Sequence, residues 1–265
     1  MADQGNNYYF NGNMGTAADQ QAAAQQQQQQ SQRTADVLAA TSGAMHVNLA
    51  ELTAAGADEI SEQKFNTIIA VMLLYGFAVN AILCFVLGDS ILDMVTLHPF
   101  AYVGIYVVGV IVGMIICSKA ENPVLGFIGY NLIVVPMGIF ITPMLTLYDI
   151  TTIQYAFCVM GVCMMLMIGL AQLYPKFFCS IGRMLFSCLV IGLLSEVILW
   201  CFGLTSGVFD FIFVGIFLAY IGYDWAVAQS SRKTSTNAIR AAYMIYVDLI
   251  NLLIRLLRII SKNRN

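Results

Sequence analysis

Charged side chains are scarce in this sequence: they make up 10% of its 265 residues, against 59% for apolar ones. A soluble domain typically carries about 25% charged residues. Of the 12 basic and 15 acidic side chains, only sixteen fall between residues 65 and 261. So few charges cannot keep a globular surface of that length hydrated. The sequence therefore excludes an ordinary soluble enzyme and predicts an all-α integral membrane protein.

Histidines, paired cysteines and basic stripes are also missing. The only histidines, His46 and His98, lie outside the predicted core, which argues against a zinc site or a bis-histidine haem. The seven cysteines form no Cys-x-x-Cys pair, so neither a disulfide framework nor a thiolate metal site is expected. The net charge of −3 comes without a basic stripe, which argues against nucleic acid as a partner. We expect neither catalytic residues nor a bound cofactor.

The composition divides the chain into three parts. Residues 1–63 are rich in Asn, Gly, Ala and Gln, with an unbroken run from Gln25 to Gln30, and are expected to form a disordered cytoplasmic tail. Apolar positions near helical spacing within 34–63 predict a short surface helix there. Residues 64–261 form the predicted transmembrane domain, and residues 262–265 a short polar tail.

Seven transmembrane helices are predicted. Four charge-free intervals each exceed the roughly 20 residues that a spanning helix needs, and two apolar stretches and a last helix follow them. Pro136 and Pro143 predict a kink in the third helix. The predicted helices cover residues 65–88, 94–118, 122–148, 150–175, 184–204, 208–229 and 238–260.

Lys and Arg alternate between the predicted loops. They flank the first helix and occupy every even-numbered loop, and they are absent from the odd-numbered loops. Because basic residues favour the cytoplasmic side, the amino terminus and the even loops are predicted to face the cytoplasm across a cell membrane, of the bacterial inner-membrane type. A full seventh span would then place Arg255 and Arg258 outside. That helix either violates the rule or is short, central or re-entrant.

Two carboxylates fall near the inner ends of neighbouring helices. Asp224 lies about 7.5 Å from its helix end and Asp248 about 12 Å into the next helix, at 1.5 Å per residue. Because these helices are antiparallel around one loop, the carboxylates are predicted to lie at similar depth. Two carboxylates in a low-dielectric site cannot both ionise cheaply, so one is expected to hold a proton. Such a pair suits a proton sensor, a cation ligand pair or an aspartic protease; alternatively, each bonds a neighbouring backbone group or Arg.

Four polar residues share one face of the last predicted helix. Asp248, Asn251, Arg255 and Arg258 are spaced three, four and three residues apart. A polar stripe of that length needs protein or water around it, and lipid supplies neither. The last helix is therefore predicted to be the centre of the bundle.

Other intramembrane polar residues carry two interpretations each. Asp210 is fourteen residues before Asp224, on nearly the same face, and either lines a cation path or is a solvated helix start. Glu196 either lines the outer part of that path or pairs with Arg255. Asn80 and Asn131 are more typical of helix–helix contacts than of ligand binding.

The carboxy-terminal segments resemble the Bax inhibitor-1 superfamily. The resemblance rests on Tyr223-Asp224, on the run AAYMIYVDLINLL at 241–253, on LLRI at 256–259, and on the 24 residues between the two Asp. It implies a central seventh helix wrapped by six others. It also implies that Asp224 and Asp248 form a pH-responsive pair that gates a calcium leak.

The resemblance also implies partners, and the sequence departs from the family pattern at two positions. Some members are linked to a membrane-bound ATP-dependent protease, and eukaryotic ones to suppression of cell death. Family members often carry an arginine near the start of the third helix that latches to the acidic pair. Here the nearest basic residue is Lys119, and Trp225 follows the first Asp where a smaller residue is more usual.

Three functions are compatible with these observations. The first is a proton-regulated calcium or cation leak channel. The second is a non-conducting membrane protein that binds and restrains a membrane protease or another membrane partner, with the amino-terminal tail as a contact. The third is an intramembrane aspartic protease, whose second motif normally reads Gly-x-Gly-Asp; here Tyr246-Val247-Asp248 occupies that place.

Overall fold

The computed structural model describes residues 59–202 and 207–262, and all regular structure in these two ranges is helical. Residues 1–58, which make up most of the predicted tail and surface-helix region, and residues 263–265 lie outside them, whereas the first described helix begins within the predicted tail at Glu62. The helices are α2 (Glu62–Leu97), α3 (Pro99–Lys119), α4 (Pro123–Leu145), α5 (Ile150–Leu173), α6 (Pro175–Ser180), α7 (Gly182–Cys201), α8 (Val208–Ser230) and α9 (Ser235–Lys262).

Local signals set the helix ends. Ser61 caps α2 by accepting from the backbone N–H of Lys64 at 3.3 Å, and Asn122 caps α4 by accepting from that of Leu125 at 2.8 Å. Proline stands at the first turn of α3, α4 and α6, where its missing N–H leaves no hydrogen bond unmade. Pro136 and Pro143 lie inside α4, which continues through both.

Six of these helices are long and apolar enough to cross a membrane: α2, α3, α4, α5, α7 and α8. Apolar side chains such as Leu74, Phe85 and Val108 are exposed on the outer helices, as expected of a lipid-facing surface. The structure thus confirms the all-helical membrane class, with six candidate spans in the described ranges where the sequence predicted seven.

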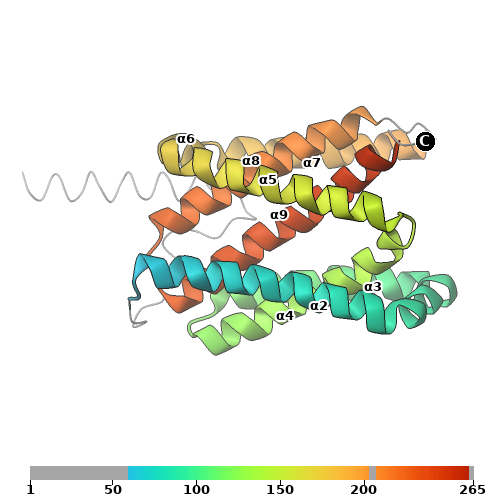
Figure 1. The fold of residues 1–265 in the computed structure, drawn as a ribbon, viewed down its shortest axis with the longest axis horizontal. Helices are drawn as coiled ribbons and strands as arrows, with labels where there is room; N and C mark the ends of the chain where they lie inside the picture. Colours follow the sequence, from blue (N-terminus) through green and yellow to red (C-terminus); the bar gives the residue numbers. More distant parts are fainter. Residues whose placement is uncertain (1–58, 203–206, 263–265) are drawn as a thin grey trace, which may run out of the picture. The chain divides into compact units, whose positions relative to one another are not determined.

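Helix α9 differs from those six because it is amphipathic and not uniformly apolar. It packs against α2, α4, α5 and α8, and Figure 1 shows it passing obliquely between α2 and α4 below and α5 and α8 above. Its buried side chains include Tyr246, Leu249, Leu252 and Leu253.

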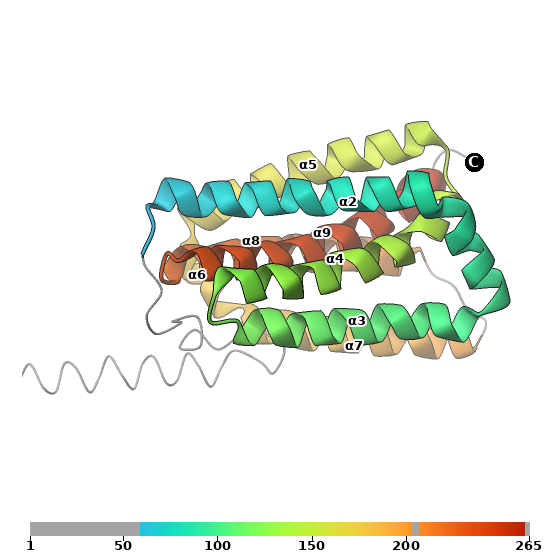
Figure 2. The ribbon, with the colours of Figure 1, turned by 90° about the horizontal axis from the view of Figure 1, so that it is seen from below.

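Different helix ends and connections meet at the two ends of the bundle (Figure 2). The start of α2, the α3–α4 connection, α6 and the α8–α9 loop gather at one end, called the basic end below because it carries Lys64, Lys119, Lys176, Arg183, Arg232 and Lys233. The α4–α5 connection, the start of α8 and the end of α9 meet at the opposite end, called the distal end below.

Glycine allows α3 and α4 to approach closely. A Cβ at Gly129 would lie 2.8 Å from the backbone nitrogen of Cys117, and one at Gly113 would lie 2.8 Å from the carbonyl oxygen of Gly129. Small residues at such crossings let helix backbones touch inside a membrane. This contact fixes α3 against α4, and α4 in turn packs on α9.

Candidate functional site

Asp224 of α8 and Asp248 of α9 meet inside the bundle. Only 2% and 7% of their surfaces are exposed, and their carboxyl groups share a hydrogen bond. A hydrogen bond between two carboxyl groups requires a proton on one of them. The two carboxyl groups therefore interact across the contact between α8 and α9, and such a pair can hold a proton between two helices.

Tyrosines surround the pair. Tyr220 interacts electrostatically with both carboxyl groups, and Tyr223 and Tyr243 interact with Asp224. A hollow of about 10 Å³ reaches Asp224 from the α8–α9 loop, with room for about one water molecule. Its walls are Asp224, Val227, Ala228, Ser231, Asn237, Ala241 and Met244. The pair is thus closer to water at the basic end than elsewhere.

Apolar side chains close the route from the pair toward the distal end. Phe213 and Phe217 of α8 and Leu249, Leu252 and Leu253 of α9 are all buried. From Asp248 to the next charged residue of α9, Arg255, the helix rises about 10 Å. Buried apolar side chains around this stretch make a charge costly there, because moving a charge into an apolar interior is unfavourable.

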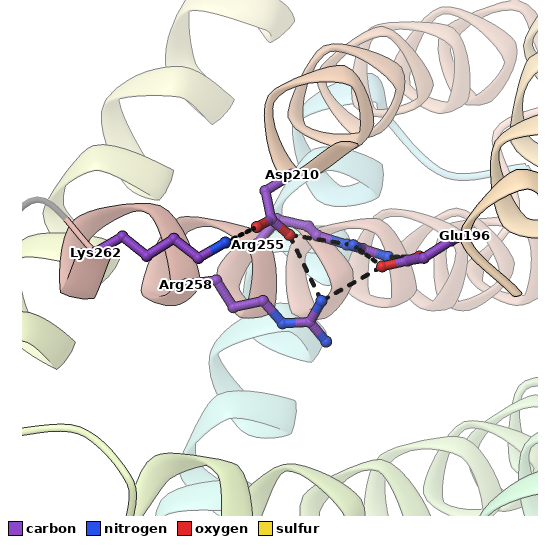
Figure 3. Close-up of polar contacts among 5 residues, drawn as sticks. All are labelled: Glu196, Asp210, Arg255, Arg258 and Lys262. Carbon is purple, nitrogen blue, oxygen red and sulfur yellow. Dashed lines mark hydrogen bonds and ion pairs between the residues drawn. The ribbon is translucent and has the colours of Figure 1, made fainter. Parts of the chain in front are cut away.

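A second charged group, the distal ionic cluster, lies beyond these apolar side chains and consists of Glu196, Asp210, Arg255, Arg258 and Lys262 (Figure 3). Arg255 donates from Nη1 and Nη2 to the two carboxylate oxygens of Glu196, at 2.7 and 2.8 Å. Its Nη1 also donates to Asp210 at 3.2 Å, and its guanidinium stacks 4.1 Å from the Phe213 ring centre. Bidentate Arg–carboxylate contacts are among the strongest in proteins.

Two further cations complete the distal ionic cluster. Nη1 of Arg258 lies 3.5 Å from Glu196 and 3.5 Å from Asp210, and Nζ of Lys262 donates to Asp210 at 3.1 Å. The Asp210 side chain is 5% exposed. The interpretation of Asp210 as a solvated helix start is therefore wrong: α9 is long enough to bring its cations over the first turn of α8.

The remaining predicted residues have separate outcomes. The pairing of Glu196 with Arg255, one of its two interpretations, is confirmed. Asn251 donates to the carbonyl of Val247 in its own helix at 2.8 Å. Lys119 is exposed at the last residue of α3, so it does not stand in for the arginine latch. Asn80 and Asn131 bond Tyr246 and Tyr75 across helices at 2.6 Å, as predicted.

The course of α9 explains why Arg255 and Arg258 depart from the alternation of basic residues between loops. The helix runs from the α8–α9 loop at the basic end to Asp210 at the distal end. Its last three cations therefore lie opposite the other basic residues. Glu196 and Asp210 offset two of these three positive charges.

Sequence reasoning missed Arg240. This residue is 2% exposed and donates to the carbonyls of Cys117 at 3.0 Å and Ala120 at 3.1 Å. Those carbonyls belong to the end of α3, where the helix dipole favours a cation. Its neighbours Ala241 and Ala242 were the available signal, since small residues allow a close helix crossing.

A second missed feature joins the start of α2 to the α8–α9 loop. The backbone N–H of Ile60 donates to the carbonyl of Lys233 at 2.9 Å, and Arg232 bonds Glu59 at 2.8 Å. The Nζ atom of Lys233 lies 4.5 Å from the centre of the Phe65 ring and donates to the last carbonyls of α8. Partial burial lowers the pKa of this lysine. Gln229 also bonds Asn66 at 2.7 Å.

Together, the apolar helices and the buried charge groups define a multi-pass α-helical membrane protein. The model of the family described as inhibitor of apoptosis-promoting Bax1 matches residues 60–265, and the chain belongs to this Bax inhibitor-1 family. No curated protein and no solved structure matches the chain. The resemblance inferred from the two Asp motifs is confirmed.

Proposed function

We propose that this protein is a pH-sensitive cation leak channel, with calcium as its principal ion, and that Asp224 and Asp248 form its gate. The observation that carries the proposal is the hydrogen bond between two buried carboxyl groups from different helices. In this proposal α9 is a seventh spanning helix at the bundle centre, and six helices surround it.

The shared proton supplies the gating chemistry. While it is present, the pair carries one negative charge and joins α8 to α9. As pH rises and the proton leaves, two negative charges face each other in a medium that screens them poorly. Repulsion then separates the helices, and the leak increases with pH.

The proposed preference for calcium follows from the carboxylates of Asp224 and Asp248. Carboxylate oxygens are hard ligands that suit calcium, whose sites usually provide six to eight oxygens. Two carboxylates alone bind calcium weakly, and conduction needs a site that releases its ion. The hollow from the α8–α9 loop gives the route by which protons or cations reach Asp224.

The basic end is proposed to face the cytoplasm, which puts the amino-terminal segment on that side of a bacterial-type cell membrane. Support comes from the basic residues gathered there, since cytoplasmic loops are enriched in Lys and Arg.

A non-conducting regulator is the second candidate, with a membrane-bound ATP-dependent protease or another membrane protein as its partner. The contacts of Glu59 and Ile60 with the α8–α9 loop favour it, because they connect the tail to the helices that carry the acidic pair. An aspartic protease is disfavoured, because a hollow of about 10 Å³ admits no peptide.

Calcium flux into proteoliposomes tests the channel proposal. Wild type is compared across pH 5.5 to 8 with Asp248→Asn and with the matched control Asp93→Asn, which changes an exposed carboxylate on α2. Flux should rise with pH in wild type and in the control, and Asp248→Asn should lose that dependence because its amide has no proton to release. Equal pH profiles for all three proteins contradict the gate.

Removal of residues 1–58 separates the two candidates. A channel conducts without them, since both carboxylates and their helices are retained. A chain that shows no flux before or after truncation, but loses a membrane-protein partner on truncation, is a regulator.

A further inference from the structure

A groove at the distal end joins an apolar surface to a single cation. It has a volume of about 130 Å³ and lies between the end of α4 with its following turn and the last turns of α9. Its walls are Met144, Leu147, Tyr148, Ile254, Leu257 and Arg258. Sites for soluble small molecules usually reach about 300 Å³ or more, so this groove suits a short stretch of an alkyl chain.

Arg258 retains hydrogen-bonding capacity at the edge of the groove. Its Nη1 is 3.5 Å from both carboxylates, which is too long for strong hydrogen bonds, and its side chain is 38% exposed. Figure 3 shows the other terminal nitrogen directed away from the acidic residues. The guanidinium can therefore bind a further anion, and its planar fork matches the oxygens of a phosphate.

The charge balance of the distal ionic cluster also favours an anion. Three cations face two carboxylates, which leaves one positive charge in excess within the described residues. Arg255 is satisfied by Glu196 and Asp210, so the excess charge lies on the exposed members, Arg258 and Lys262. Leu147, beside them, is 78% exposed. Apolar and cationic surfaces thus meet at one end of the membrane-spanning helices.

We propose that this groove binds a phospholipid of the surrounding bilayer. The phosphate lies on the guanidinium of Arg258, with the ammonium of Lys262 beside it, and the start of one acyl chain lies against Leu147, Ile254 and Leu257. Charge complementarity favours an anionic headgroup over a zwitterionic one, because only the anionic lipid offsets the excess positive charge. The apolar walls favour a lipid over free phosphate.

Native mass spectrometry of the full chain, released from detergent, tests the site. Phosphatidylglycerol, phosphatidylcholine and inorganic phosphate are titrated in turn. We expect phosphatidylglycerol to bind more tightly than phosphatidylcholine, and inorganic phosphate not to bind. Phosphate that binds as tightly as the lipid, or equal affinity for the two lipids, overturns the assignment.

Two variants and one control locate the binding. Arg258→Gln should weaken phosphatidylglycerol binding about tenfold, from the loss of one charge-assisted contact. Leu147→Ser removes an exposed wall of the groove and should also weaken it. Arg232→Gln is the matched control, because that side chain is equally exposed, at 38%, and lies at the basic end. Lipid binding that falls equally in the control, or in neither variant, contradicts the site; the same retention on size exclusion for all proteins confirms that they fold.

Discussion

The two buried carboxylate groups of α8 lie on one face of the same helix but are neutralised differently. Asp224 and Asp210 are fourteen residues apart, about 21 Å along the helix. At the basic end Asp224 interacts with the carboxyl group of Asp248, whereas at the distal end cations of α9 contact Asp210. A proton leaves when pH changes and a tethered guanidinium does not. Under the proposed function, the pH response would therefore arise at the basic end, and the distal end would hold the helices together at every pH.

The largest effect is expected for Arg255→Met. It leaves the buried Asp210 and the partly exposed Glu196 without the guanidinium that contacts both, and breaking one side of a buried ion pair destabilises a protein by about 3–5 kcal/mol. Thermal unfolding in detergent measures the loss. The control Arg232→Met breaks an exposed pair, where about 0–1 kcal/mol is expected. Equal losses of stability in the two variants would contradict the distinction between the buried ion pairs of the distal ionic cluster and an exposed ion pair.

Asn substitution at the two α8 aspartates is the most direct comparison. Asp210→Asn should lower stability by about 2–3 kcal/mol at every pH from 5 to 8, since Arg255 and Lys262 lose a charged acceptor. Asp224→Asn should stay within about 1 kcal/mol of wild type at low pH, because its amide can donate as the protonated acid does.

The pH slopes of the same unfolding data separate the two groups further. In wild type, removal of the shared proton adds a second negative charge, so stability should fall as pH rises. Asp224→Asn should flatten that slope and Asp210→Asn should keep it. The interpretation fails if Asp224→Asn retains the wild-type slope.

Lys262→Gln should have the smallest effect. The ammonium is 58% exposed, so its contact with Asp210 contributes about 0–1 kcal/mol in dilute buffer. Unfolding in 0.5 M salt should reduce the difference from wild type further, because exposed charges are screened. A loss as large as that of Arg255→Met would show that the exposed cation is the main partner of Asp210.

Helix positions were predictable where apolar runs coincide with helices, and less so where charges interrupt them. The first predicted span ends at residue 88, whereas α2 continues to Leu97 through Asp89 and Asp93. Backbone hydrogen bonds do not require apolar side chains, so a helix can continue beyond its apolar segment. The six-residue α6 was missed because a helix of that length has no resolvable apolar period.

Contacts between side chains were predictable where a short loop joins the two helices that carry them. Asp224 and Asp248 lie near one loop on neighbouring antiparallel helices, which allowed their contact to be predicted, although Asp224 is six residues before the end of α8 and Asp248 thirteen residues after the start of α9. The cluster around Asp210 was harder to predict from the sequence, because the contact of Lys262 with Asp210 depends on how α9 crosses α8. The partners of Arg240 belong to α3, more than a hundred residues earlier, and no local pattern specifies such a contact.

The contact between Glu59-Ile60 and the α8–α9 loop has a mechanical consequence. The loop joins the two helices that carry the acidic pair. A pull on Glu59, whether from a bound protein or from an attached tether, would act on that loop before it reached the rest of α2.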